Sequence, residues 1–443
     1  MPDLHTDTIY ALSSGAGRAG VAVVRVSGAG AKSVVEALCG ALPTPRLAKF
    51  CTLYSPGDGA VIDEAIVLWM SAPNSFTGED VAEFQVHGGR AVVSRLLAVL
   101  ETFDGCRIAS AGEFTGRAFY NGKMDLVAVE GLADLIAAET EEQRRQAVFQ
   151  QSGGASARYS DLGERLTKVL AYTEAAIDFV DEEGVEESAL KNVVQSLTGI
   201  KGDLAAMLDD QHRGERLRDG VRVVIAGAPN VGKSRLLNAL ARRDAAIVSP
   251  IEGTTRDAIE VAIDIAGVPV VFVDTAGLRT NSQDQIELLG MARTRQHIGE
   301  ADLTIWVEAP DVEPAAESRF DSETLRILNK ADLLTEPKDQ PAYDLSMSAL
   351  NQADIEVLVT KLAEMVKKRY HGDEPALITR HRHRVAVQNC LNSVTEALGA
   401  IDQPLELVAE NIRLAVREIG RIVGRVDVED LLDVIFQDFC VGK

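Results

Sequence analysis

The sequence predicts a multidomain chain of three parts: an N-terminal α+β domain at residues 1–121, a discontinuous all-α helical domain at residues 122–217 and 373–443, and an α/β domain at residues 218–372 inserted between the helical halves. Three observations predict this division. The 443 residues are more than one domain needs, since domains usually have about 100–200 residues. Helical periodicity flanks a long central stretch on both sides. Within that stretch, strand-like and helix-like runs alternate, which is typical of a parallel sheet.

The first part alternates short apolar runs with turns. Residues 21–26 and 65–69 are apolar and rich in β-branched side chains, which favours strands. Residues 91–101 have helical spacing. Strands and a helix mixed in this order, with Gly, Ser and Pro between them, predict a compact α+β domain.

The second part begins after Met124, where apolar residues recur at helical spacing as far as residue 153. A further helical stretch at residues 162–177 precedes the acidic segment 178–187, and a third follows it. The helical pattern returns from residue 384 to the C-terminus. Helices tolerate an insertion when the ends of the inserted part lie close together. The residues that set the first helical pattern are Leu126, Val129, Leu132, Leu135 and Ile136.

The charge balance argues against a general electrostatic grip on nucleic acid. The formal net charge is −22 at pH 7, whereas proteins that bind nucleic acid through bulk charge are basic. Any RNA contact is therefore expected to be local, although most basic clusters are solvated surfaces. The candidate clusters are Arg213, Arg216, Arg218 and Arg222, residues 367–369 and residues 380–384.

The sequence indicates a cytoplasmic protein with no membrane partner. No apolar run approaches the about 18 residues of a membrane span, and no basic-then-apolar leader follows Met1. The five cysteines are scattered and form no Cys-x-x-Cys pair. They suggest neither a disulfide framework nor a zinc site.

A glycine-rich loop predicts a nucleotide site. The segment GAPNVGKS at residues 227–234 fits GxxxxGK[ST], follows an apolar strand and precedes a helical run. Backbone N–H groups of such a loop surround the phosphates, Lys233 neutralises the β- and γ-oxygens, and Ser234 presents a hydroxyl to Mg²⁺. The expected nucleotide contacts here are Asn230, Val231, Gly232, Lys233 and Ser234.

Three further motifs predict a Ras-like P-loop G domain. The DTAG turn, formed by Asp274, Thr275, Ala276 and Gly277, ends a second apolar strand, where Asp274 can hold Mg²⁺ through a water and the Gly277 N–H can contact the γ-phosphate. The NKAD motif, with Asn329, Lys330 and Asp332, closes a later strand. Ser348 and Ala349 would supply a backbone contact to the guanine O6, with Leu350 where a basic residue is common.

The NKAD motif makes guanine the expected base. The carboxylate of Asp332 can accept hydrogen bonds from N1 and N2 of guanine. Adenine lacks those donors and would leave a buried carboxylate unpaired, so we expect ATP to be rejected by about 10⁴-fold or more.

The segment SPIEGTTRD at residues 249–257 is expected to move with the nucleotide state. Thr255 is our choice for the threonine that closes over the γ-phosphate and ligates Mg²⁺. Leu278 stands where Ras-like proteins have the glutamine that positions water, so another group must do so. Asn230 could hold a monovalent cation and Glu287 could orient the water, although each residue alone is more often an ordinary polar side chain.

These motifs resemble those of the tRNA uridine-modification GTPases of the MnmE, or TrmE, family, among the TrmE-Era-EngA-like GTPases, and the resemblance covers nearly the whole chain. It implies potassium-dependent hydrolysis, with Glu287 orienting the water. The implied potassium ligands are Asn230, Ser249, Ile251 and Thr254. Further segments that look like family signatures are GVAVVRVSG at 20–28, NSFTGED at 74–80, QVHGG at 85–89, GEFTGRAFYNGKMDL at 112–126 and the C-x-G-K ending at 440–443.

The resemblance further implies a folate-binding-like N-terminal domain that forms a homodimer and binds a 5-formyl- or methylene-tetrahydrofolate. A carboxylate such as Glu83 suits the amidine-like edge of a pterin, and basic groups suit the anionic tail. Cys440 is an implied catalytic residue, although its acidic neighbours would raise the pKa of its thiol. The implied folate contacts are Arg25, Glu83, Lys123 and Lys443.

The function implied by the resemblance is a GTP hydrolase that, with an FAD-dependent partner resembling MnmG (GidA), modifies C5 of the wobble uridine of tRNA to a carboxymethylaminomethyl or aminomethyl form. No flavin fingerprint follows a strand in this chain, so FAD is expected on the partner. One alternative is a ribosome-assembly GTPase of the Era or EngA type, although no GXXG loop of a KH domain follows Ser348 in a matching context. Another is a folate-dependent one-carbon transferase with a regulatory G domain.

Overall fold

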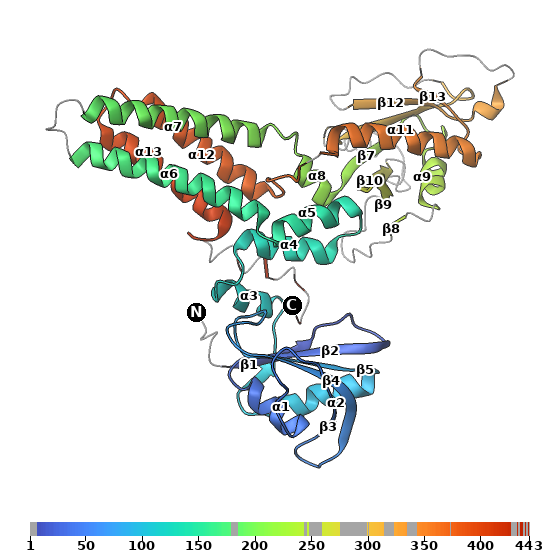
Figure 1. The fold of residues 1–443 in the computed structure, drawn as a ribbon. Coiled ribbons are helices and arrows are strands. Elements are labelled where there is room, and N and C mark those ends of the chain that lie inside the picture. The colour runs from blue at the N-terminus through green and yellow to red at the C-terminus, as the bar shows by residue number, and fades with distance from the viewer. Residues whose placement is uncertain are drawn as a thin grey trace, which may run out of the picture. The chain divides into compact units, whose positions relative to one another are not determined.

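The computed structural model describes residues 7–178, 185–242, 246–247, 259–274, 299, 301–313, 323–334, 343–372, 374–426, 432, 435–436, 439 and 442 (Figure 1). The chain packs as two compact units. The first comprises residues 1–133, 150–193 and 399–443, and the second comprises residues 134–149 and 194–398. This division cuts through the helical region, so the three-domain boundaries expected from the sequence stay a prediction.

The first unit contains a six-stranded sheet with the order β3-β4-β5-β2-β1-β6. Neighbouring strands are antiparallel except β1 and β6. Alternate residues of β2, such as Val24 and Val26, join the core with α1 and α2 on one face of the sheet. The elements are β1 (Thr8–Leu12), β2 (Ala19–Ser27), α1 (Ala31–Cys39), β3 (Lys49–Tyr54), β4 (Val61–Met70), β5 (Val81–Gly88), α2 (Arg90–Glu101) and β6 (Cys106–Ile108).

Helices complete the first unit. The short α3 (Glu113–Tyr120) places Phe114 in a small core with Ile9 and Ala11 on the second face of the sheet. Two long helices, α6 (Gly154–Asp178) and α13 (Leu405–Val423), pack along one another. Among the described residues, no helix is both long and apolar enough to cross a membrane.

The helical run expected from Met124 to residue 153 is not continuous. It forms α4 (Leu126–Ala137) and α5 (Glu141–Gln151), with a break between them. Thr140 and Gln143 explain the break, because Oγ1 of Thr140 accepts from the Gln143 N–H at 3.4 Å and Oε1 of Gln143 accepts from the Thr140 N–H at 3.1 Å. This reciprocal capping starts a new helix.

The second unit contains a seven-stranded sheet with the order β13-β12-β11-β7-β10-β9-β8. Five strands from β13 to β10 run parallel, and β9 and β8 are antiparallel to their neighbours. Parallel order and apolar strands agree with the α/β pattern of the sequence. The elements are α7 (Val185–Leu208, shared with the first unit), α8 (Arg213–Asp219), β7 (Val221–Ala226), α9 (Lys233–Ala241), β8 (Ala246–Ile247), β9 (Ile259–Ile265), β10 (Val268–Asp274), β11 (Leu303–Glu308), β12 (Glu323–Leu328), β13 (Leu345–Ser346), α11 (Gln352–Tyr370) and α12 (His381–Gly399).

The segments that enter and leave this sheet region lie side by side. Arg213 at the start of α8 donates to the carbonyl of Glu374 at 2.7 Å. Gly214 packs so closely on Ile378 that an added Cβ would lie 2.1 Å from the carbonyl oxygen. The side chain of Gln146 makes two hydrogen bonds of 2.8 Å with the backbone of Ala376. An inserted domain requires such neighbouring ends.

Candidate functional site

The glycine-rich loop after β7 has the backbone geometry that phosphate binding needs. Gly227 has φ 141°, and a Cβ there would lie 2.1 Å from the carbonyl oxygen of Val307 in β11. Gly232 has φ 102°, and a Cβ there would lie 2.4 Å from Nδ2 of Asn329. Only glycine fits either position without displacing its neighbour. The loop therefore lies closely against the ends of β11 and β12.

Lys233 begins α9 and points back along its own loop. Its ammonium donates to the carbonyls of Gly227 and Ala228 at 2.9 and 2.8 Å, and only 8% of the residue is exposed. Gly232, the N-cap of α9, has no side chain with which to cap the first turn. The amides at a helix start favour an anion. Ser234 lies in that same first turn, where the motif places the hydroxyl that ligates a phosphate-bound cation.

Asn329 joins the phosphate loop to the predicted guanine loop. It is 2% exposed, donates from Nδ2 to the carbonyl of Val231 at 2.8 Å, and accepts from the Ala349 N–H at 3.0 Å. Thus three sequence motifs distant in the chain meet on one amide side chain. The structure gives Asn329 a positioning role, since its hydrogen bonds go to backbone groups of the two loops.

The sequence analysis missed Asp354, which fixes the Ser348 end of the guanine loop. Its Oδ2 accepts from the Ser348 N–H at 2.8 Å. It lies in the first turn of α11, whose N-cap Asn351 accepts from the Ala353 N–H at 3.1 Å. The pattern Asn-x-x-Asp before a helix was the available signal.

Of the predicted base-recognition residues, Asp332 lies at the surface, whereas Ser348 and Ala349 are buried. Asp332 is in a 3-10 turn at Ala331–Leu333 that follows β12. The expected rejection of ATP rests on a buried carboxylate, so it now depends on the base itself covering Asp332. Lys330 has φ 57° and pairs with Asp311 at 2.7 Å. A hydrogen bond from Lys330 lowers the pKa of Asp311.

The remaining nucleotide predictions lie at or beyond the limits of the described chain. Asp274 ends β10 and pairs with Ile225 of β7, which puts it at the sheet edge where the phosphate loop starts. Asn230 is exposed in the loop with φ 65°. The residues Ser249, Ile251, Thr254, Thr255, Thr275, Ala276, Gly277, Glu287, Cys440 and Lys443 lie outside the described residues, so their roles stay predictions.

Two of the predicted folate contacts meet directly in the N-terminal sheet. Arg25 of β2 and Glu83 of β5 are register partners, and Nη2 of Arg25 lies 2.8 Å from Oε1 of Glu83. The guanidinium carbon also lies 5.0 Å from the ring centre of Phe76 and 5.7 Å from that of Phe114. The two side chains are 19% and 18% exposed, so they can still be reached from outside.

Lys123 lies against the NSFTGED segment, and Gly442 lies against Leu12 and Ser13. A Cβ on Gly78 would lie 3.4 Å from Cε of Lys123. Gly442 accepts a 2.8 Å hydrogen bond from Ser13 and would clash with Leu12 if it carried a Cβ. Because Leu12 follows Ala11, the register partner of Arg25, Gly442 lies near the Arg25 strand. A terminus is often frayed, but Gly442 is packed.

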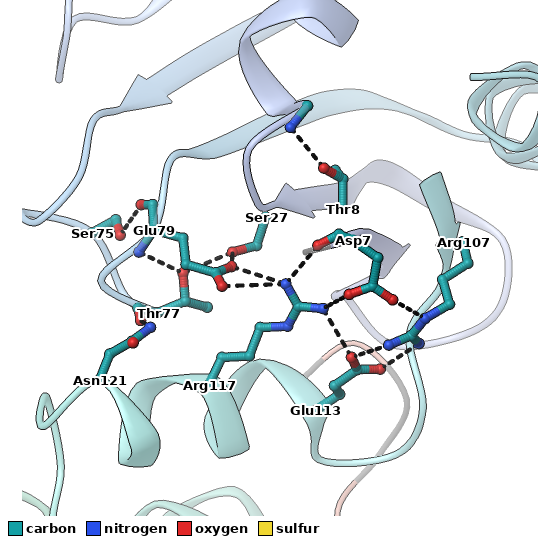
Figure 2. Close-up of polar contacts among 11 residues, drawn as sticks. Asp7, Thr8, Ser27, Ser75, Thr77, Glu79, Arg107, Glu113, Arg117 and Asn121 are labelled. Carbon is teal, nitrogen blue, oxygen red and sulfur yellow. Dashed lines mark hydrogen bonds and ion pairs between the residues drawn. The ribbon is translucent and has the colours of Figure 1, made fainter. Parts of the chain in front are cut away.

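A buried ion-pair cluster joins two of the signature segments (Figure 2). Arg117 is 1% exposed and contacts Asp7 at 2.8 Å, Glu79 at 3.1 Å and Glu113 at 3.1 Å. Arg107 contacts both Asp7 and Glu113. Glu79 belongs to the NSFTGED segment, whereas Glu113 and Arg117 belong to the GEFTGR segment. Sequence reasoning missed this cluster, because its members are scattered over 110 positions.

The two arginines keep Asp7 and Glu113 ionised. Burial alone would raise the pKa of Glu113, but hydrogen bonds from Arg107, the Ser110 N–H and Arg117 lower it below its usual value. The pKa of Asp7 is also lowered, since hydrogen bonds and charges of the two arginines outweigh burial. The cluster is therefore a compensated charge network with a structural role.

The basic clusters considered for RNA contact are largely engaged within the second unit. Arg216 pairs with Asp302 at 2.8 Å, and Arg218 and Arg380 both contact Asp134. Arg384 pairs with Asp210 at 2.6 Å and with Glu215 at 2.9 Å. By contrast, residues 367–369 at the end of α11 are exposed.

The fold and the site together define a P-loop nucleotide-binding protein. The phosphate loop joins the first strand and helix of a mostly parallel sheet, and the NKAD and Ser-Ala loops meet it at the carboxyl ends of the strands. This is where open α/β sheets bind their ligands.

Comparisons with known proteins identify the family. The model of the MnmE helical domain matches residues 126–440, and that of the GTP-binding protein TrmE N-terminus matches residues 8–123. Proteins named tRNA modification GTPase MnmE are 49% identical in Methylobacterium sp. (strain 4-46) and in Parvibaculum lavamentivorans, over 99% of this chain and 100% of theirs. The chain belongs to the family of tRNA modification GTPases MnmE.

A solved structure, the G domain of the T. maritima FeoB iron transporter, matches 32% of this chain and 97% of its own length at 21% identity. The TM-score of 0.24 is too low to carry an argument.

Proposed function

We propose that this chain is a GTP hydrolase that acts in cytoplasmic tRNA modification. The observation that carries the proposal is the junction of phosphate loop and guanine loop on Asn329, in a chain whose relatives along its full length are named tRNA modification GTPases. The chain after Ser348 supports this function over a ribosome-assembly GTPase that contains a KH domain. The described residues of this part form the helices α11, α12 and α13 and the turns beside them.

The phosphate loop would position the nucleotide for attack by water. Lys233 would exchange its two carbonyl partners for β- and γ-phosphate oxygens, which carry more negative charge and are stronger acceptors. Ser234 and Thr255 fit a magnesium ion, which when bound neutralises phosphate charge. In this proposal Glu287 orients the water, and Asp332 selects guanine.

We further propose that hydrolysis requires potassium. Asn230 is exposed within the loop, and its amide oxygen is an oxygen ligand of the type that alkali cations take. The proposed set also includes Ser249, Ile251 and Thr254. Potassium, when bound, supplies the positive charge that an arginine finger supplies elsewhere.

The test compares GTP hydrolysis in potassium and in sodium chloride at equal ionic strength, for the wild type and for Asn230→Gly. Glycine is preferred to alanine, because φ 65° strains any residue with a Cβ. We expect potassium-specific acceleration in the wild type and its loss in the variant. Equal wild-type rates in both salts would contradict the potassium requirement while leaving the GTPase assignment intact.

The N-terminal domain is proposed to bind a 5-formyl- or methylene-tetrahydrofolate in a homodimer. Both contacts from Arg25 use Oε1 of Glu83, and among the described residues Oε2 has no hydrogen-bond partner. This oxygen suits the amidine-like edge of a pterin, while Arg25, Lys123 and Lys443 suit an anionic tail. The folate would supply a one-carbon unit.

Calorimetric titration with 5-formyltetrahydrofolate tests this site. Glu83→Gln is expected to weaken binding at least tenfold, since one charge-assisted hydrogen bond is worth about 1.5–3 kcal/mol. Glu64→Gln, at an exposed position of the neighbouring β4, is the control and should bind as the wild type does. Equal affinity of the two variants would remove Glu83 from the site.

The complete activity is proposed to need an FAD-dependent MnmG-like partner. Together they would modify C5 of the wobble uridine to an aminomethyl or carboxymethylaminomethyl form, with Cys440 acting in the chemistry. Nucleoside analysis of tRNA from cells that carry Lys233→Met or Cys440→Ser would separate the two roles. Normal uridine modification in the Lys233→Met cells would contradict a need for GTP hydrolysis.

A further inference from the structure

Two cysteines outside the nucleotide and folate motifs lie at the edge of the N-terminal sheet. Cys39 is in the last turn of α1, and Cys51 is in the edge strand β3. Cys51 pairs with Ala65 of β4, which belongs to the core covered by α1 and α2. Residues opposite one another in an antiparallel pair share a face. The Cys51 side chain therefore faces α1, whereas its neighbour Phe50 faces outward and is 67% exposed.

The two thiols are neighbours. Helix α1 packs against β3, and both cysteine side chains lie half-buried at the border of the same core. Burial, with a smaller contribution from the neighbouring Cys51, raises the pKa of Cys39 to about 12. The end of a helix and an edge strand therefore hold two thiols beside one another.

A cation completes the cluster. Lys49 lies two residues before Cys51 on the same face of β3, and its charge lowers the pKa of Cys39. Its ammonium donates to the carbonyl of Ala41, in the turn that follows α1 at Gly40. The cluster thus consists of two thiols and one ammonium, positioned by the end of a helix and by an edge strand. A nearby cation favours the thiolate that attacks disulfides.

We propose that Cys39 and Cys51 form a redox modification site, a dithiol that becomes an intramolecular disulfide by exchange with a low-molecular-weight disulfide. The Cys51 thiolate attacks one sulfur of the oxidant, forms a mixed disulfide and expels one thiolate. Cys39 then loses its proton to solvent and attacks the Cys51 sulfur, which expels the second thiolate. The protein loses two electrons and two protons, and the small disulfide is reduced to two thiols.

The bond would fasten the edge strand β3 to α1. In a compartment held reducing by glutathione the pair stays a dithiol and oxidises only when the ratio of disulfide to thiol rises. The linked loop is short, and closing it restricts the unfolded chain. The site is independent of the nucleotide loop and of the proposed function.

The experiment equilibrates the full-length wild type with graded mixtures of oxidised and reduced glutathione, alkylates the remaining thiols and maps the peptides by mass spectrometry. We expect a peptide pair linked through Cys39 and Cys51, with two fewer alkylated thiols per chain, and a melting temperature raised by a few degrees. Cys106, which is also half-buried in this domain, is the internal control and should stay out of the linked pair.

Two variants sharpen the test. Cys51→Ser should abolish the linked peptide. Lys49→Gln should slow the closing attack by Cys39 and move the pH profile of that step to higher pH, because the charge of Lys49 lowers the pKa of Cys39. A merely structural role for Lys49 would not shift that profile. Glutathione adducts on both cysteines without a link, or full alkylation of both in the most oxidising mixture, would overturn the proposal.

Discussion

The phosphate loop and the ion-pair cluster of the N-terminal domain each bury a long basic side chain, but they hold it in opposite ways. Lys233 donates to two carbonyls of its own loop, five and six positions away. Arg117 contacts three carboxylates, of which Glu113 is one helical turn away and Asp7 and Glu79 come from distant parts of the chain. Carbonyls carry only partial charge and yield to phosphate, whereas carboxylates compensate the arginine permanently. The first arrangement suits ligand exchange, and the second suits rigidity.

The largest expected effect is the loss of the Arg117 charge. Arg117→Met would leave Glu79 without its arginine and would leave Asp7 and Glu113 with Arg107 alone. Breaking a buried ion pair in this way costs about 3–5 kcal/mol. Hydrogen exchange in the N-terminal sheet should accelerate strongly, while GDP affinity of the second unit stays unchanged. Arg95→Met, which breaks an exposed pair with Asp58, is the control and should have little effect. Equal exchange rates in both variants would refute a structural role for the cluster.

The reciprocal change is Lys233→Met, which keeps the aliphatic stem and removes the charge. Charge-assisted hydrogen bonds are worth about 1.5–3 kcal/mol each, so GTP affinity should fall by about 100-fold. Unfolding of the protein in urea should change less than in Arg117→Met, because the two carbonyls that accept from Lys233 are neutral. Lys361→Met on the exposed side of α11 is the matched control. A large loss of stability in Lys233→Met would remove the contrast between the regions.

The acids of the cluster predict a loss of stability in acid. Asp7 and Glu113 have a pKa lowered by folding, so their stabilisation is complete above the unfolded pKa values of about 4 and lost as pH falls through the folded values. The stability of the N-terminal sheet against urea should therefore fall progressively below about pH 4. In Arg117→Met this dependence should flatten. An unchanged slope in the variant would assign the acid sensitivity to other groups.

The smallest expected effect concerns the bridge between the two nucleotide loops. Asn329→Ala removes one donor and one acceptor from buried backbone groups and should cost about 1–3 kcal/mol in GDP affinity. Fluorescent GDP titration measures this loss. Asp332→Asn is the comparison, since it should lower the preference for guanine over adenine without altering the loops. Asn329→Ala with wild-type GDP affinity would show that the bridge is dispensable.

Much of the fold was predictable from local patterns. The two glycines of the phosphate loop, the apolar strand before it and the helix after it lie within one contiguous segment, so their spacing alone indicates their joint geometry. The strand and helix alternation likewise predicts a parallel sheet. The break at Thr140 is also encoded locally, in the capping pair of Thr140 and Gln143. The apolar periodicity on both sides of this pair nevertheless predicts one continuous helical run.

The sequence by itself determined the phosphate loop, the α/β pattern and the family signatures, because these depend on residues that are neighbours in the chain. Only the tertiary structure decided that Arg117 meets Asp7 and Glu79, that Gly442 packs on Leu12, and that Cys39 and Cys51 lie at the border of one core. The physical reason is that strand order and helix packing bring these residues together, and neither can be read from the spacing of side chains along one segment.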